Sequence, residues 1–359
     1  MRQIVVGLGF MIAGCSAVPG ATSEMDAGRD FMRQPALVTD AAVTTTGPLS
    51  LSDTGLYSDF ASRTLAPRII PFAPKYPFWA DGAEKNRFLL LPAGSQINTS
   101  NMDFWSFPIG TKVWKEFRVG GKLVETRLLW KQLDSGPSGW WMVSYVWAPD
   151  GSAATATPGG VSNALGTTHD VPSQQDCLKC HGNAGDVVIG VSAIQLSATV
   201  AATGVDAGAD AGGADGGVAT GTLTQLGAMG LLTVAPASEF QVPGSGNVQA
   251  ALGYLHGNCG HCHNDESALS LQSAMRLRLS TTNTAPEQTP TYKTAFGLKT
   301  RHVVPPNVDT AIVPGFPDKS QLYVRADRRD SWGMPPLGTK VVDPVGSVQI
   351  YDWILNLPH

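Results

Sequence analysis

Two short segments of the chain carry cysteine and histidine at the same spacing. They are Cys177-Leu178-Lys179-Cys180-His181 and Cys259-Gly260-His261-Cys262-His263. Two cysteines separated by two residues can each form a thioether with a vinyl group of haem, and the histidine that follows then binds the iron. The chain has only five cysteines and seven histidines in 359 residues, so two chance copies are improbable. The sequence therefore predicts two covalently attached c-type haems held by Cys177, Cys180, His181, Cys259, Cys262 and His263, with both of these histidines as iron ligands.

The same residue types could serve two other chemistries. A zinc site usually pairs two CxxC motifs about 15–20 residues apart, whereas these motifs begin at residues 177 and 259. A thioredoxin-like thiol pair requires a βαβ setting, and neither motif has one. Haem attachment is thus the favoured interpretation, and zinc binding and thiol redox chemistry are the alternatives.

The second motif has the more complete surroundings. A helix is expected over residues 247–258, because Val248, Leu252 and Leu255 recur at helical spacing and lead directly into the motif. Downstream, Met334 is followed by two prolines, which would hold its loop stiff, and its sulfur is the predicted sixth ligand of the second iron. His261 is expected to face outwards. His256 is expected to be a polar cap or a neighbour of a haem propionate.

The first motif has fewer such signals. No clear helix precedes it, since Val171-Pro172-Ser173 is typical of a turn. Few residues separate it from the next linker, so its haem must pack against another part of the chain. The sixth ligand of this iron stays open between Met142, His169, Met229 and no ligand at all.

The elements that must position these motifs predict an α+β protein, in which a β-rich N-terminal domain precedes a mainly α-helical, cytochrome c-like haem-binding region. The predicted strands contain many Val, Leu, Phe and Trp residues, and Gly120-Gly121 is a hairpin turn between two of them. Their bounds are Arg87–Leu91, Lys112–Val119, Lys122–Trp130 and Trp140–Trp147. A last helix is expected over Pro344–Leu357, with Val348, Tyr351, Ile354 and Leu355 on one side.

Composition shifts along the chain predict six segments. These are a signal peptide (1–14), a flexible tether (15–48), a β-rich, Trp-rich domain (49–155), a first haem-binding segment (156–202), an Ala/Gly/Asp-rich linker (203–221) and a second haem domain (222–359). The β-rich domain holds seven of the nine tryptophans, which are expected to form a core, the alternative being an aromatic groove or a cover over a haem edge. The linker is predicted to be solvated, and calcium binding is its less favoured alternative.

The N-terminus has the features of an export signal. Arg2 precedes an apolar run over residues 4–13, which is too short to span a bilayer. The run ends in Ile12-Ala13-Gly14-Cys15, which resembles a bacterial lipobox with Cys15 as the lipidated residue; Ser16 favours sorting to the outer membrane. One cysteine then fits the anchor and four fit the two motifs, so none is left for a disulfide.

The charge balance limits the class of partner. The net charge is −4 and there is no basic run, which argues against nucleic acid. The expected partners are redox proteins of the cell envelope, facing the periplasm or the cell surface, and a membrane reached through the lipid anchor.

Several segments resemble a family of bacterial dihaem c-type cytochrome lipoproteins of undefined role. They are Leu51–Tyr57, Trp79–Lys85, Phe107–Thr111, Glu125–Trp130, Pro172–Cys177, Tyr254–Cys259, Pro314–Ser320 and Met334–Gly338. The resemblance covers about residues 49–359 apart from the Ala/Gly/Asp insert. Residues 222–359 also resemble a class I cytochrome c domain. Both resemblances imply haem at the two motifs and an exported protein, and they imply no substrate.

Three functions follow from these features. The favoured one is a dihaem electron carrier with no catalysis of its own. The second is a peroxidase-like haem oxidoreductase whose first iron has an open sixth position. The third is a docking module, in which the β-rich domain binds a partner and the haems provide the redox output.

Overall fold

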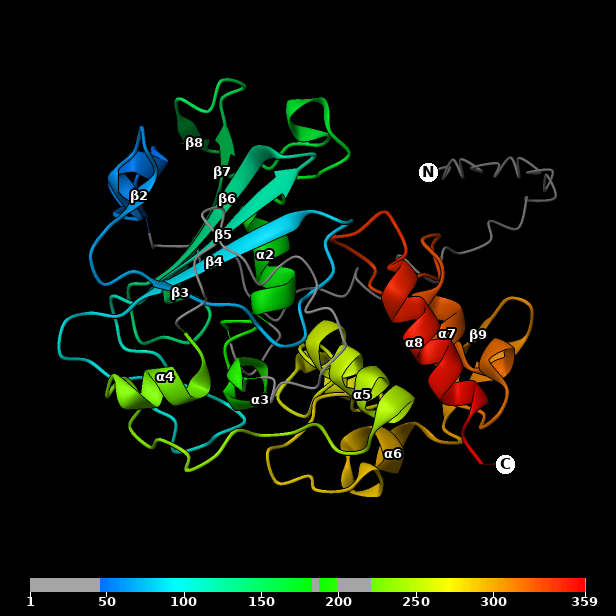
Figure 1. Ribbon diagram of the computed structural model, residues 1–359. Coiled ribbons are helices and arrows are strands. Elements are labelled where there is room, and N and C mark those ends of the chain that lie inside the picture. Colours follow the sequence, from blue (N-terminus) through cyan, green and yellow to red (C-terminus); the bar gives the residue numbers. More distant parts are fainter. Residues whose placement is uncertain (1–45, 183–186, 199–220, 359) are drawn as a thin grey trace, which may run out of the picture.

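The computed structural model describes residues 46–182, 187–198 and 221–358. Its largest element is an antiparallel sheet whose six strands follow one another in chain order (Figure 1). The strands are β3 (Ile70–Pro71), β4 (Glu84–Leu90), β5 (Lys112–Val119), β6 (Lys122–Lys131), β7 (Trp140–Trp147) and β8 (Ala154–Ala156). The four long strands are those that the sequence predicts, and the expectation of an α+β protein is confirmed at this level.

The remaining elements are short. Two small antiparallel pairs join β1 (Tyr57–Asp59) to β2 (Thr64–Leu65) and β9 (Lys299–Val304) to β10 (Val308–Thr310). The α-helices are α2 (Gln174–His181), α3 (Ala193–Leu196), α4 (Leu223–Ala228), α5 (Gly246–Asn258), α6 (Pro290–Ala295), α7 (Gln321–Ala326) and α8 (Pro344–Leu355). Single 3₁₀ turns lie at η1 (Leu51–Thr54), η2 (Ala164–Gly166), η4 (Ala268–Leu271), η5 (Pro286–Gln288) and η6 (Pro317–Lys319).

The turn between β5 and β6 has the geometry that its two glycines predict. Val119 pairs with Lys122, and the two residues between them, Gly120 and Gly121, have φ values of 56° and 77°. A two-residue turn with positive φ at both positions matches the twist of the strands, and glycine adopts it without steric cost.

Both faces of the sheet are covered. Phe88, Trp114 and Leu128 point to one face and pack with residues of η1 and β1. Their neighbours in sequence, Leu89, Val113 and Leu129, point to the other face and pack with residues from α3 and α4. Alternate residues of one strand thus serve two cores, which is why its sequence does not alternate cleanly between apolar and polar. Five of the seven predicted core tryptophans are buried, namely Trp105, Trp114, Trp140, Trp141 and Trp147.

The helices α5 and α8 form the second core. Leu252 and Leu255 of α5 pack with Ile350 and Trp353 of α8. A Cβ at Gly346 would lie 2.1 Å from the Tyr254 ring, so the helices cross where only glycine fits. The buried face of α8 agrees with the predicted one only in part: Ile354 is buried as expected, but Val348 and Leu355 are exposed and Trp353 is buried instead.

The loop before β4 joins the two parts of the molecule. The Tyr76 ring lies against Gly253 of α5, where a Cβ would be only 2.0 Å away. The side chain of Asn258 accepts a hydrogen bond from the Trp79 N–H over 2.7 Å and donates one to the Pro77 carbonyl over 3.2 Å. This loop therefore fixes the end of α5 against the sheet domain.

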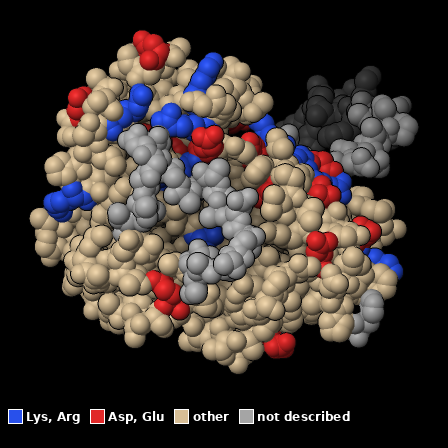
Figure 2. Space-filling model, viewed as in Figure 1, with Lys and Arg blue, Asp and Glu red and all other residues tan. Residues whose placement is uncertain are grey.

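The charged side chains are unevenly distributed. On the face drawn in Figure 2, most Lys and Arg side chains gather over the upper part, where Figure 1 shows the sheet, and the lower part is mostly uncharged. No helix of the described residues is long and apolar enough to cross a bilayer. The predicted signal peptide, Cys15 and nearly all of the tether and linker lie outside the described residues.

Candidate functional site

The second CxxCH motif is presented by the end of α5. The helix ends at Asn258, and the Cys262 and His263 N–H groups then donate to the Cys259 carbonyl over 3.1 and 2.9 Å. At Gly260 a Cβ would lie 2.7 Å from the His256 carbonyl oxygen, so this turn accepts only glycine there. The turn brings Cys259, Cys262 and His263 into the lining of a cavity of about 790 Å³.

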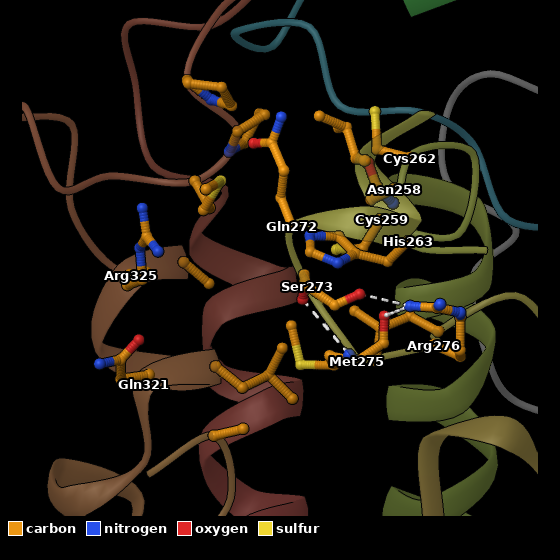
Figure 3. A pocket seen from close by; sticks show the side chains of 18 of the residues that line it. Asn258, Cys259, Cys262, His263, Gln272, Ser273, Met275, Arg276, Gln321 and Arg325 are labelled. Carbon is orange, nitrogen blue, oxygen red and sulfur yellow. Dashed lines mark hydrogen bonds between the residues drawn. The ribbon is translucent and has the colours of Figure 1, made fainter. Parts of the chain in front are cut away.

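This cavity has two distinct walls. In Figure 3, Cys259, Cys262 and His263 lie on one wall, and Gln321 and Arg325 of α7 lie on the opposite wall. Its volume falls within the range of roughly 300–1,000 Å³ that is usual for small-molecule and cofactor sites. It is large enough for a planar cofactor held from one side by the motif.

The ring of His263 lines the cavity. Burial lowers its pKa to about 4, although the Met275 backbone acts in the opposite direction. Its Nδ1 is buried and has no hydrogen-bond partner among the described residues. A neutral imidazole has one ring nitrogen with a free lone pair, which is the form that can bind a metal.

Met334 lines the same cavity as His263, together with Pro335 and Pro336. Its N–H donates to the Arg325 carbonyl over 2.8 Å, and Arg329 donates to its carbonyl over 3.2 Å. The backbone of this loop residue is thus fixed at the cavity wall by the Arg325 carbonyl and the Arg329 side chain. That Met334 ligates iron stays a prediction.

The first motif lies within a helix, which the sequence did not indicate. Helix α2 begins after Ser173, whose hydroxyl accepts from the Asp176 N–H while the Asp176 carboxylate accepts from the Ser173 N–H. Such a reciprocal capping box satisfies two helix-end donors and fixes where the helix begins. Cys177, Cys180 and His181 line a second cavity of about 490 Å³.

His181 has a defined tautomer. Its Nδ1 donates to the Val187 carbonyl, which leaves Nε2 as the metal-binding atom. Burial, and then the charge of Lys115, lower its pKa to about 3. A neutral imidazole is the form that binds iron, so both motif histidines have the protonation state that a haem ligand requires.

The two cavities are neighbours. Phe78, Cys180 and Leu337 line both. Consistent with this, the charge of His261 lowers the pKa of His181, and the charge of Cys180 raises that of Cys262. Cofactors in the two cavities would therefore be separated by single side chains.

Of the three candidates for the sixth ligand at the first motif, one lies away from the cavity and two line it. Met229 caps α4, is 48% exposed and lines neither cavity. Met142 of β7 and His169 both line the cavity of the first motif. Met142 also packs in the core cluster that contacts Cys177 and Leu178.

His169 belongs to a buried network that the sequence did not reveal. Its Nε2 lies 2.7 Å from Glu125 Oε2, and Arg127 donates to both oxygens of that carboxylate over 2.7 and 3.0 Å. Glu125 is fully buried; burial acts to raise its pKa, but Arg127 and His169 overcome this and lower it to about 2. Phe117 packs against the His169 and Arg127 side chains. Because 44 residues separate Glu125 from His169, no local pattern connects them.

His261 and His256 lie close to the second motif, and the expected orientation of His261 is wrong. His261 was expected to face outwards, but it is 5% exposed, lines the cavity of the second motif and lies edge-on to the Phe78 ring at 5.2 Å. The tight turn from Cys259 to Cys262 folds it inwards, and its Nδ1 has no partner among the described residues. His256 accepts from the Leu279 N–H over 3.0 Å, which ties the irregular segment around Leu279 to α5.

The surroundings of the four motif cysteines favour the neutral thiol. Burial raises the pKa of Cys177 to about 11 and that of Cys259 to about 12, and it also raises those of Cys180 and Cys262. The four form no disulfide. Because the thiolate is the reactive form in thiol exchange, such values disfavour a thiol-redox role. Among the described residues, no group of three or more His, Cys, Asp or Glu side chains is arranged to hold a bare metal ion; haem iron needs only one or two protein ligands.

Comparison of the chain with models of protein families, with curated proteins and with solved structures found no match of any of the three kinds.

Proposed function

We propose that this chain is an exported dihaem c-type cytochrome that transfers electrons in the bacterial envelope. One observation carries the proposal. Each CxxCH motif presents two unpaired cysteines and a half-buried histidine to a cavity, and the two cavities share lining residues. A pair of adjacent sites with thiols and a neutral imidazole suits two covalently attached haems better than it suits any ligand that binds reversibly.

The residues divide into clear roles. Bound haem iron supplies a one-electron couple to each site. Cys177 and Cys180 form the thioethers of the first site and Cys259 and Cys262 those of the second. His181 binds the first iron through Nε2, because its Nδ1 donates to the Val187 carbonyl. His263 binds the second iron. Phe78 and Leu337 line both sites and lie between them.

The second site follows the order of a class I cytochrome c. A helix (α5) leads into the motif, the Met334 loop follows, and a last helix (α8) packs across the first. In this proposal Met334 supplies the sixth ligand of the second iron. A thioether favours ferrous iron and gives the site a high potential.

The envelope location rests on the N-terminus. An apolar run that ends in Cys15 gives the chain an export signal and a lipid anchor, with the outer membrane as its destination. The partners are then other redox proteins of the envelope. An exported protein that holds its haem covalently does not lose it outside the cell.

A haemochrome assay combined with intact mass tests the proposal. Protein matured in a host that attaches c-type haem should carry two haems. The double variant Cys177→Ser/Cys180→Ser should carry one, and so should the matched variant Cys259→Ser/Cys262→Ser. Colourless protein with the mass of the processed chain would contradict the proposal.

A second candidate function is favoured by the His169–Glu125–Arg127 network. A histidine held by a buried carboxylate beside a guanidinium can move a proton to or from a small bound molecule and stabilise its negative charge. If the first iron has an open sixth position, this network would make the site a peroxidase-like oxidoreductase. Ferric high-spin bands that shift on adding cyanide or peroxide would favour this function, and fully low-spin spectra would favour the carrier.

A further inference from the structure

Three basic side chains stand side by side across the central strands of the sheet. Arg87 of β4 is the cross-strand partner of Lys115 of β5, and Lys115 is in turn the partner of Arg127 of β6. Partners in an antiparallel pair have Cβ atoms about 4.5–5.5 Å apart, and like charges placed this way destabilise a sheet. We call these three residues the cation row.

The cation row faces the cavity of the first motif. All three of its residues line that cavity, as does Lys85, two residues before Arg87 and on the same face of β4. Lys115 and Arg127 are close enough to Cys180 and His181 to change the pKa of both. Positive charge is therefore gathered at the place where the first haem would be attached.

The acidic side chains of this cavity are engaged elsewhere. Among the described lining residues they are Asp81, Asp170 and Asp176. Asp170 pairs with Lys340 and Asp176 with Lys179, each at 2.7 Å, and Asp81 accepts from the backbone of residues 340–341.

Within the row itself, Glu125 pairs with Arg127. Lys115, at the centre, forms no ion pair with any described residue, and its amine has only the Ile189 carbonyl, at 3.4 Å. Burial and then the charges of Arg87 and Arg127 lower the pKa of Lys115 to about 7, so an anion bound beside the Lys115 amine would favour its charged form.

We propose that Lys115, with Arg87 and Arg127 on either side, forms an anion site for carboxylate-type oxyanions beside the first haem. Two sources have this chemistry, namely the propionates of that haem and a small free oxyanion. Arginine binds carboxylates through two parallel hydrogen bonds and lysine binds them as a point charge. The inference rests on the proposed function, because it assigns a partner group at the same site.

The test uses the dihaem protein with Lys115→Met, with Lys115→Arg as the charge-conserving variant. Lys122→Met, at an exposed position of the same hairpin, is the control. The haem count is measured first in every sample. If each variant carries two haems, the proposed function holds and any change in the variant reports on the anion site alone. If Lys115→Met does not fold, Lys115→Gln takes its place.

If the propionates fill the site, Lys115→Met shifts the propionate band in the resonance Raman spectrum. It also lowers the reduction equilibrium constant of one haem by up to about tenfold, or about 59 mV, because a nearby cation favours ferrous iron. Lys115→Arg restores both. If a free oxyanion fills the site, phosphate added at constant ionic strength shifts the spectrum saturably, and Lys115→Met abolishes the shift. No Raman shift in Lys115→Met together with no response to phosphate in the wild-type protein overturns the inference.

Discussion

Asp81 and Thr339 are 258 residues apart in the chain, yet the Thr339 hydroxyl donates to Asp81 Oδ1 over 2.6 Å. The same carboxylate accepts from the N–H groups of Lys340 and Val341, each at 3.0 Å. Asp81 belongs to the loop before β4, and Thr339 closes the loop that carries Met334. One carboxylate of the sheet domain thus fixes the end of a loop that lines the cavity of the second motif.

Asp81→Ala should release this loop. Hydrogen bonds to a charged group contribute about 1.5–3 kcal/mol, so imidazole should displace the Met334 sulfur from the second haem at an about tenfold lower concentration. Optical titration with imidazole measures this. Asp150→Asn is the control, since Asp150 is exposed and bonds only within its own turn. Equal imidazole affinity in Asp81→Ala and the wild-type protein would contradict the role.

Met334→Ala should lower the potential of one haem and open its iron to exogenous ligands, because the soft sulfur favours the ferrous state. A potentiometric titration followed optically measures both haems. Met275→Leu is the matched control, since Met275 lines the same cavity. Unchanged titration curves in Met334→Ala, or the loss appearing in Met275→Leu instead, would show that another group is the ligand.

His169→Ala should convert one ferric haem from low-spin to high-spin. A metal-bound histidine usually donates its other ring N–H to a carboxylate, and His169 has such a partner in Glu125. Met142→Leu should leave the spin state unchanged. Electron paramagnetic resonance of the ferric protein measures it. If Met142→Leu becomes high-spin and His169→Ala does not, the sulfur of Met142 is the sixth ligand. A wild-type protein that is already high-spin would support the peroxidase-like function.

The lowered pKa of Glu125 predicts that the free energy of unfolding falls in acid. Its pKa in the folded protein is about 2, below the usual 4.5, so its contribution is present above about pH 4.5 and is lost as the pH falls toward 2. A shift of this size corresponds to about 3 kcal/mol. Glu125→Gln should be less stable at neutral pH and should show a flatter acid limb in urea unfolding. The control is Glu84→Gln at an exposed position, and an acid limb equally steep in Glu125→Gln and the control would refute the assignment.

Cys15→Ser should move the protein from the membrane fraction to the soluble fraction, because a lipid-modified cysteine is the predicted anchor. Fractionation followed by immunoblotting measures this. Ser16→Ala, beside the anchor, should stay with the membrane. Retention of Cys15→Ser in the membrane fraction would count against lipidation.

Local patterns predicted the elements and the residues of the two motifs, but not the side chains that surround the motifs. The hairpin at Gly120-Gly121 and the helix over residues 247–258 depend on neighbouring residues, so the sequence could indicate both. The contacts of Glu125 with His169 and of Asp81 with Thr339 depend on chain segments far apart. Lys115 stands between Arg87 and Arg127 only once three strands are in register. His261 was misjudged because the direction of a side chain within a tight turn depends on what packs against it, here Phe78.

The residues shared by the two cavities bear on how two haems bound there would be reduced. If haem irons occupy both cavities, an electron on one would alter the field at the other, because Phe78, Cys180 and Leu337 line both cavities. The two would then titrate as an interacting pair, with apparent potentials that belong to the pair. Reduction of the first haem would make reduction of the second harder, and the titration of the molecule would extend over a wider span of potential than that of either haem alone.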